Sequence, residues 1–134
     1  MKKVTVNKLS KIIVVVLIVA VVCLGLFVVE AQTKVFRRAF DNFVMDNENH
    51  YLPCDKLPTE AEVRAIVRQH QDIVQAIEQV NPGLVGVDVD SYSSTCPGKA
   101  DLVIWYASHQ NRLAIKTIIG GDTFFGVPYR LQNR

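Results

Sequence analysis

The sequence lacks the short motifs that mark many catalytic and cofactor sites. No serine lies in a Gly-x-Ser-x-Gly arrangement, and Gly120-Gly121 has neither the repeat nor the strand-to-helix setting of a phosphate-binding loop. The three histidines, His50, His70 and His109, show no H-x-x-x-H spacing that would make them zinc ligands. We therefore expect a protein that is not an enzyme, with no catalytic, metal-binding or cofactor-binding residues.

Cysteine is scarce, with three residues in the whole chain. Neither Cys54 nor Cys96 has a second ligand at C-x-x-C spacing, which argues against a zinc site. Cys23 lies in an apolar run, where a thiol behaves as a small hydrophobe. Cys54 and Cys96 predict a disulfide, which would close a loop of about 43 residues and stabilise the fold by roughly 4 kcal/mol. The alternative is two free thiols in a reducing compartment.

Neither sign of charge dominates, since 15 Lys and Arg residues stand against 13 Asp and Glu residues, a net charge of +2. Five of the cations lie close to the apolar run: Lys2, Lys3, Lys8, Lys11 and Lys34. The remainder of the chain is therefore close to neutral and has no dense basic patch. This composition argues against nucleic acid as a partner.

The longest uninterrupted feature is an apolar run of 18 residues, Ile12–Val29. As a helix it would be about 27 Å long, close to the hydrocarbon thickness of a bilayer. The lysines of residues 1–11 predict a cytoplasmic tail, and residues 12–29 a transmembrane signal-anchor. The protein would then be a single-pass membrane protein with its C-terminal domain periplasmic or extracellular. The alternative is cleavage after Ala31, in the sequence Val29-Glu30-Ala31, which would release a secreted form.

Residues 30–50 predict a membrane-proximal amphipathic helix. Apolar residues recur at helical spacing on one side (Val35, Phe36, Ala39, Phe40, Phe43 and Val44), while Arg37, Arg38 and Asp41 lie on another. This helix could lie against lipid headgroups, or its phenylalanines could pack into the following domain.

Residues 51–134 predict an extracytoplasmic α+β domain. Thr59 and Glu62 form a capping box before an apolar stripe that continues to Val80, which predicts one long helix. Strands are expected at 85–90 and 102–107. A hairpin turn at 109–112, a returning strand at 113–119 and a last strand at 123–131 would follow. The expected fold is a helix packed on an antiparallel sheet of about four strands.

Aromatic residues are concentrated near the C-terminus: Trp105, Tyr106, Phe124, Phe125 and Tyr129. They predict an interaction surface on the uncovered face of the sheet, and the alternative is that they complete the core. Asp88 and Asp90 are interpreted as the solvated face of a strand, and His70 as a core or stripe-edge residue.

The leading hypothesis is a non-catalytic, membrane-anchored interaction or accessory subunit. Its partners would be the lipid bilayer and other membrane or envelope proteins; its oligomeric state is left open. In layout the chain also resembles a type IV pilin, with an apolar N-terminal helix, an amphipathic extension, a meander and a cysteine pair. A pilin's leader cleavage site and following glutamate have no counterpart, because the first acid is Glu30. The third hypothesis is a secreted binding or inhibitory domain released after Ala31.

Overall fold

The computed structural model describes residues 8–92 and 94–134. It divides into two compact units, Met1–Arg37 and Arg38–Arg134. Most of the predicted basic tail, residues 1–11, lies outside the described residues. In the first unit, α1 (Lys8–Thr33) is followed by the beginning of α2 (Val35–Phe43).

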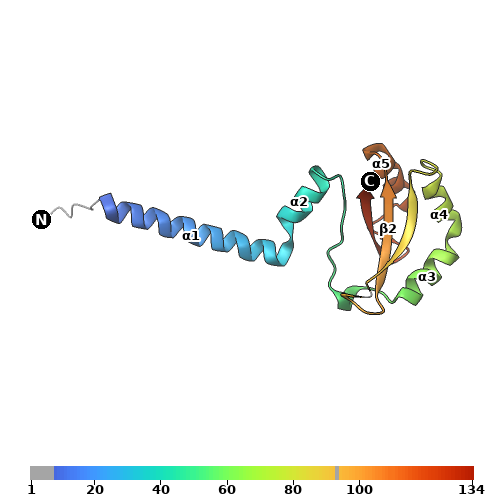
Figure 1. Ribbon diagram of the computed structural model, residues 1–134, viewed down its shortest axis with the longest axis horizontal. Coiled ribbons are helices and arrows are strands. Elements are labelled where there is room, and N and C mark those ends of the chain that lie inside the picture. The colour runs from blue at the N-terminus through green and yellow to red at the C-terminus, as the bar shows by residue number, and fades with distance from the viewer. Residues whose placement is uncertain (1–7, 93) are drawn as a thin grey trace, which may run out of the picture. The chain divides into compact units, whose positions relative to one another are not determined.

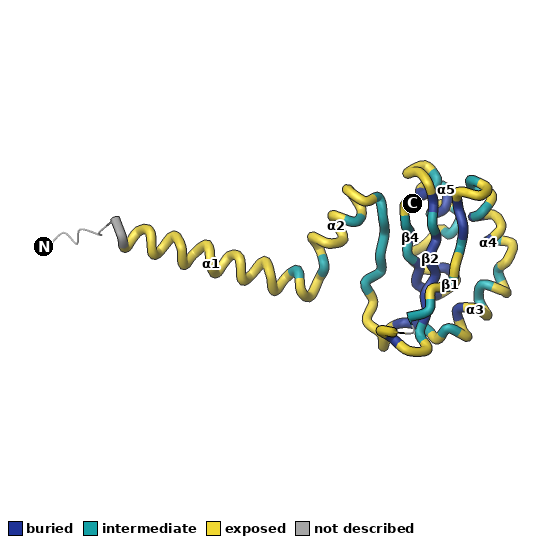
Figure 2. Tube along the Cα trace, viewed as in Figure 1, coloured by how far each residue is buried: buried dark blue, intermediate teal, exposed yellow. Residues whose placement is uncertain are grey.

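The apolar run forms the long helix that the sequence predicts. Within the α1 segment Ser10–Thr33, the most apolar 18-residue stretch has a mean hydropathy of 3.6, and none of it is buried. Figure 2 shows this exposure along nearly the whole helix. Among the described residues, it is the one helix long and apolar enough to cross a membrane.

The helix does not continue unbroken through residues 30–50. Lys34 has a left-handed φ of 54°, which ends α1 before α2 begins. The Glu30 side chain then accepts hydrogen bonds from the backbone N–H groups of Phe36 and Arg37, at 2.7 and 3.1 Å. This carboxylate satisfies amides in the first turn of α2 that have no partner within the helix.

The second unit has the predicted α+β fold, with helices packed on a four-stranded sheet (Figure 1). After the 3₁₀ turn η1 (Cys54–Lys56), its elements are α3 (Glu60–Gln69), α4 (Gln71–Glu78), β1 (Gly86–Ser91), β2 (Ala100–Tyr106), α5 (His109–Ile119), β3 (Thr123–Phe124) and β4 (Val127–Asn133). The strand order is β1-β2-β4-β3. The sheet is mixed instead of antiparallel, because β2 and β4 pair in parallel, with Leu102 beside Tyr129.

The parallel pair follows from a helix where the sequence pattern predicts strand. The predictions of a hairpin at 109–112 and a strand at 113–119 are wrong, because these residues form α5. The Ser108 side chain accepts from the Asn111 N–H at 3.3 Å, and Gly120 ends the helix with a φ of 70°. These two caps favour a helix, and their effect outweighs the strand preference of the β-branched residues at the end of the segment. A parallel strand pair needs a crossover connection, and α5 lies within it.

The predicted capping box is confirmed at the start of α3. The Thr59 hydroxyl accepts from the Glu62 N–H, and the Glu62 side chain accepts from the Thr59 N–H at 2.8 Å. The single helix expected up to Val80 is instead divided at His70, which joins α3 to α4 with φ −118° and ψ 41°. Each half still contributes to the core, through Val63 in α3 and Ile77 in α4.

The core lies between these helices and one face of the sheet. In β2, the alternate residues Leu102, Ile104 and Tyr106 are fully buried in it. Ile115 of α5 joins the same cluster. Helices α3, α4 and α5 therefore contribute to one core, and the opposite face of the sheet carries the intervening residues, such as Trp105.

Candidate functional site

Arg112 of α5 is the centre of a polar cluster. Its side chain is almost fully buried, and its guanidinium contacts Asp46 Oδ1 at 2.8 Å and Glu48 Oε2 at 3.0 Å. It also donates to the Asn42 side chain in α2. These partners lie more than 60 residues earlier in the chain. The cluster therefore joins α2, the segment after it and α5.

The carboxylates in this cluster are held in their ionised form. Burial alone would raise the pKa of Asp46, but hydrogen bonds with His109 and Arg112 lower it below its usual value. Burial also opposes ionisation of Glu48, and hydrogen bonds with Lys116 and Arg112 lower its pKa. The same contacts raise the pKa of Arg112 despite its burial. The positive and negative charges are thus matched within the domain.

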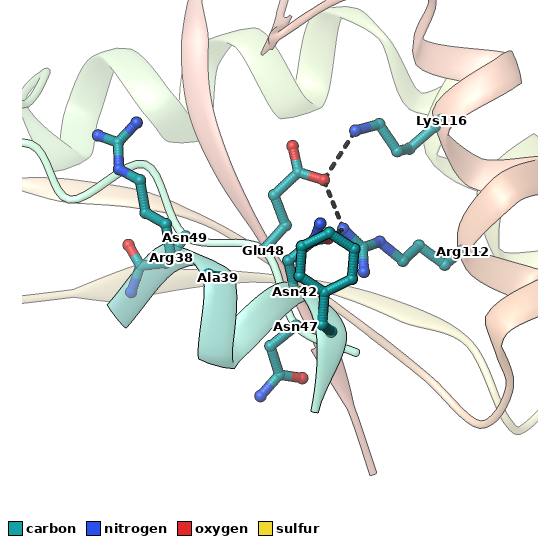
Figure 3. A pocket seen from close by; sticks show the side chains of 9 residues that line it. Arg38, Ala39, Asn42, Asn47, Glu48, Asn49, Arg112 and Lys116 are labelled. Atoms are coloured by element: carbon teal, nitrogen blue, oxygen red, sulfur yellow. Dashed lines mark hydrogen bonds and ion pairs between the residues drawn. The ribbon is translucent and has the colours of Figure 1, made fainter. Parts of the chain in front are cut away.

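A recess of about 430 Å³ opens beside this cluster (Figure 3). We call it the α2–α5 groove; it is lined by Arg38, Ala39, Asn42, Phe43, Asn47, Glu48, Asn49, Arg112 and Lys116. Glu48 lies between Lys116 and Arg112, with its carboxylate 2.7 Å from Lys116 Nζ. Glu48 pairs with Arg112 and Lys116, and Arg38 donates to the His50 carbonyl, so the groove offers hydrogen-bonding groups, the Arg38 cation and an exposed phenylalanine.

The segment Asp46–His50, which we call the strap, lies along the outer side of β4. Glu48 and Leu131 exchange two backbone hydrogen bonds, each 2.9 Å long, so the strap adds an antiparallel bridge to the sheet. The Tyr106 hydroxyl donates to the Asp46 carbonyl. The sequence predicts an amphipathic helix over residues 30–50, but α2 ends at Phe43 and the strap pairs with β4 instead. The alternation of Asp46, Glu48 and His50 was the signal that could have indicated an extended segment.

The strap reaches a second polar cluster through His50. Its Nε2 lies 2.7 Å from Asp101 Oδ2, and the Asp101 side chain is fully buried. Arg130 binds the same carboxylate with two contacts, Nε to Oδ2 at 2.6 Å and Nη2 to Oδ1 at 3.0 Å. The Tyr92 hydroxyl donates to Oδ2 at 2.7 Å. Burial raises the pKa of Asp101, but hydrogen bonds from these three residues lower it below its usual value.

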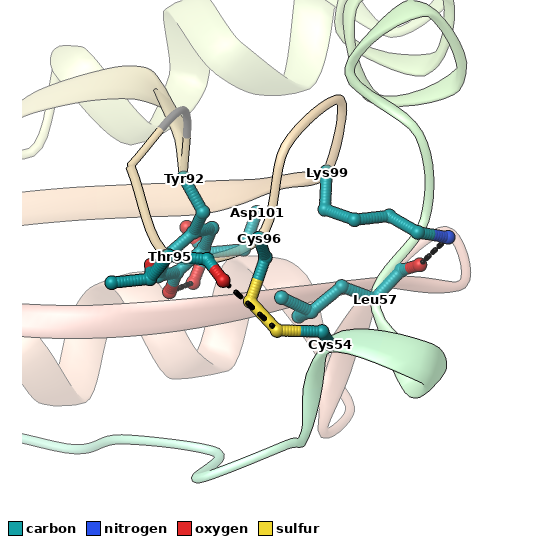
Figure 4. Close-up of a disulfide and its surroundings, with 7 residues drawn as sticks. All are labelled: Cys54, Leu57, Tyr92, Thr95, Cys96, Lys99 and Asp101. Carbon is teal, nitrogen blue, oxygen red and sulfur yellow. Dashed lines mark hydrogen bonds between the residues drawn. A yellow bond between two sulfur atoms is a disulfide. The ribbon is translucent and has the colours of Figure 1, made fainter.

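The predicted disulfide joins Cys54 to Cys96 (Figure 4). It connects η1, which follows the strap, to the loop between β1 and β2. Close by, Lys99 Nζ donates to the Leu57 carbonyl at 2.8 Å, and the Leu57 side chain is buried. The bridge and this hydrogen bond both fix the segment that enters α3. Cys23 is a free cysteine in α1.

The aromatic residues do not form the shared surface that the sequence suggested. Tyr106, Phe124 and Tyr129 are buried in the core, so they are not available to a partner. Phe125 is exposed, because it lies in the β3–β4 turn with a φ of 49°, and its ring stacks on His70 at 3.5 Å. Trp105 is half-buried on the other face of the sheet. Three of these five side chains are therefore part of the hydrophobic core.

The remaining candidate residues of β1 make structural contacts. Asp88 accepts a hydrogen bond from the Trp105 indole at 3.0 Å, and Asp90 forms an ion pair with Arg130. The Trp105 ring covers Gly86 so closely that a Cβ there would lie 2.1 Å from the indole. Both aspartates thus lie on the sheet face opposite the core, as a solvated strand face predicts.

Chemically, the arrangement can bind and position groups through hydrogen bonds and paired charges. Among the described residues, no group of three or more histidine, cysteine, aspartate or glutamate side chains is placed to hold a metal ion. The α2–α5 groove is therefore the candidate binding site of the domain. In comparisons with known proteins, no protein-family model, curated protein or solved structure matches the chain.

Proposed function

We propose that the protein is a single-pass membrane subunit that displays its α+β domain outside the cytoplasm. In this role it would be a non-catalytic interaction or accessory subunit of a larger membrane or envelope complex. The observation that carries the proposal is the exposed apolar helix Ser10–Thr33. Its 24 residues span about 36 Å, enough to cross the hydrocarbon core of a bilayer.

Two features support an orientation with the N-terminus in the cytoplasm. Four lysines precede the apolar run, and positive residues favour the cytoplasmic side. Cations also follow α1, at Lys34, Arg37 and Arg38, so the charge difference across the helix is small. The Cys54–Cys96 disulfide adds weight to the same orientation, because disulfides persist in oxidising compartments outside the cytoplasm.

The α2–α5 groove is the proposed partner site. It combines the amide side chains of Asn42, Asn47 and Asn49 with Phe43, whose side chain is 84% exposed. Protein interfaces combine an aromatic anchor with surrounding polar groups in this way. A partner seated there would contact α2, the strap and α5 together.

Intact-mass measurement of the purified protein, with and without reductant, tests the anchor. We expect a mass that includes α1, together with the mass change of one reduced disulfide. A mature form that begins at Gln32 would refute the signal-anchor. It would instead support the second candidate function, a secreted binding or inhibitory domain. The compact unit that begins at Arg38 lies wholly after the Ala31–Gln32 peptide bond, so cleavage there would leave this unit intact.

Co-purification from detergent tests the accessory role. We expect the full-length chain to elute with a partner, and Phe43→Ser to reduce that association. Phe125→Ser is the matched control, because Phe125 is also exposed but lies outside the groove. A chain that runs alone as a monomer would contradict the proposal.

A further inference from the structure

The apolar side of α2 is open to solvent over its whole length. Phe36 and Phe40, at positions i and i+4, form what we call the phenylalanine side of the helix and are 56 and 54% exposed. Val35 and Val44, at the two ends, are also more than half exposed. The sequence left open whether these residues pack into the domain, and in the structure Phe40 remains more than half exposed. A face this apolar requires an occupant.

The domain instead contacts the polar side of α2. Arg38 donates to the His50 carbonyl at 3.4 Å, Asp41 accepts from the Tyr51 hydroxyl, and Asn42 accepts from Arg112. These three residues lie opposite Phe36 and Phe40 on the helical wheel. The contacts of the domain therefore leave the phenylalanine side uncovered.

Chain connectivity places α2 at the membrane surface. One residue, Lys34, separates the end of α1 at Thr33 from the start of α2 at Val35. An α1 segment of about 36 Å exceeds the hydrocarbon thickness of about 30 Å, so its end emerges among the headgroups. With nine residues, α2 is only about 14 Å long. Because α2 starts one residue after α1 ends, it begins within the headgroup layer.

The charges next to this face suit the same environment. Lys34 lies between the two helices, and Arg37 follows in the first turn of α2. Cations at these positions are attracted to anionic phospholipid headgroups, while the aromatic side enters the boundary with the acyl chains. The Glu30 carboxylate, which caps α2, stabilises the turn at Lys34.

We infer that α2 is an interfacial helix whose phenylalanine side is buried in the outer boundary of the bilayer. The inference rests on the proposed function, because it requires α1 to remain in the membrane. In this arrangement α2 binds lipid with one side and the domain with the other.

The test uses the full-length chain in vesicles of phosphatidylcholine and phosphatidylglycerol with brominated acyl chains. Phe40→Trp, in a Trp105→Phe background, places a single indole on the proposed lipid-facing side. Leu113→Trp in the same background is the matched control, because Leu113 is 53% exposed and lies on α5. We expect Phe40→Trp to emit at shorter wavelength and to be quenched several-fold more strongly than Leu113→Trp, since interfacial helices are buried about 5–10 Å.

Equal quenching of the two variants, with the protein resistant to alkaline extraction, would overturn the interfacial helix and leave the membrane anchor standing. Extraction of the protein by alkali would overturn both. A shift to shorter wavelength without lipid quenching would indicate a second copy or another protein on this face, and would also overturn the inference.

A second measurement avoids replacing Trp105. In the chain with its native Trp105, trypsin cleavage at Arg37 and Arg38 is compared with cleavage at Arg64, an exposed site on α3. We expect vesicles to slow cleavage at the α2 sites relative to Arg64, and Phe36→Ser with Phe40→Ser to restore it. No protection by vesicles would refute the inference.

Discussion

Replacing Asp101 with asparagine is expected to lower the free energy of unfolding by about 3–5 kcal/mol, the range for breaking a buried ion pair. Three of the four contacts to the carboxylate converge on Oδ2, from His50, Tyr92 and Arg130 Nε. The fourth joins Arg130 Nη2 to Oδ1. An asparagine can keep its oxygen toward one set only, so its amide N–H₂ group would face either Arg130 Nη2 or the other donors.

The assay is urea unfolding of the full-length protein in detergent, followed by the fluorescence of its single tryptophan, Trp105. Asp55→Asn is the control, because the Asp55 side chain is 72% exposed and its ion pair with Lys56 is at the surface. Exposed pairs contribute about 0–1 kcal/mol. If the free energy of unfolding of Asp101→Asn is within about 1 kcal/mol of the wild-type value, the buried cluster does not stabilise the domain.

The difference in unfolding free energy between wild type and Asp101→Asn should depend on pH in one direction. The pKa of Asp101 is lower in the folded state than its unfolded value of about 3.9. Its contribution is therefore complete above about pH 4 and is lost as the pH falls through the folded pKa. The stability difference between wild type and Asp101→Asn should shrink as the pH falls from about 4 through the folded pKa of Asp101. A difference that grows below about pH 4 would contradict a lowered pKa of Asp101 in the folded protein.

Three further predictions concern other parts of the domain. Cys54→Ser with Cys96→Ser should lower the unfolding free energy by up to about 4 kcal/mol, measured by urea titration; an unchanged midpoint would refute a stabilising bridge. Gly86→Ala should cost about 1–3 kcal/mol and shift the Trp105 emission, because the new Cβ would clash with the indole; an unchanged spectrum would contradict that packing. Thr59→Ala should cost about 1 kcal/mol in thermal unfolding through loss of the α3 cap, and an unaltered melting temperature would refute it.

Local chemistry explains which predictions from the sequence were confirmed. The α1 helix depends on an uninterrupted apolar run, and the α3 cap on two residues three positions apart. Strands β1 and β2 follow short apolar segments close to their predicted bounds. The cysteine pair was found by elimination, since the third cysteine lies in α1. For the helices and strands, each signal is contained in the residues of the element itself.

Predictions that depended on long-range pairing were less successful. The segment of α5 contains enough β-branched residues to suggest a strand, and its caps, Ser108 and Gly120, were the competing signal. Once α5 is a helix, β4 pairs in parallel with β2, and the meander is lost. The strap was missed because its partners, Arg112 and Leu131, lie more than 60 residues away.

The sequence by itself determined that an apolar helix precedes a small α+β domain with two cysteines that can pair, because these properties follow from composition and local spacing. Only the tertiary structure decided which aromatic residues face the core and which remain exposed. Phe124 is buried and Phe125 exposed, although they are neighbours, because the β3–β4 turn directs only one of them inward. The tertiary structure likewise left Phe40 of α2 exposed, because the domain contacts this helix through polar residues such as Asn42.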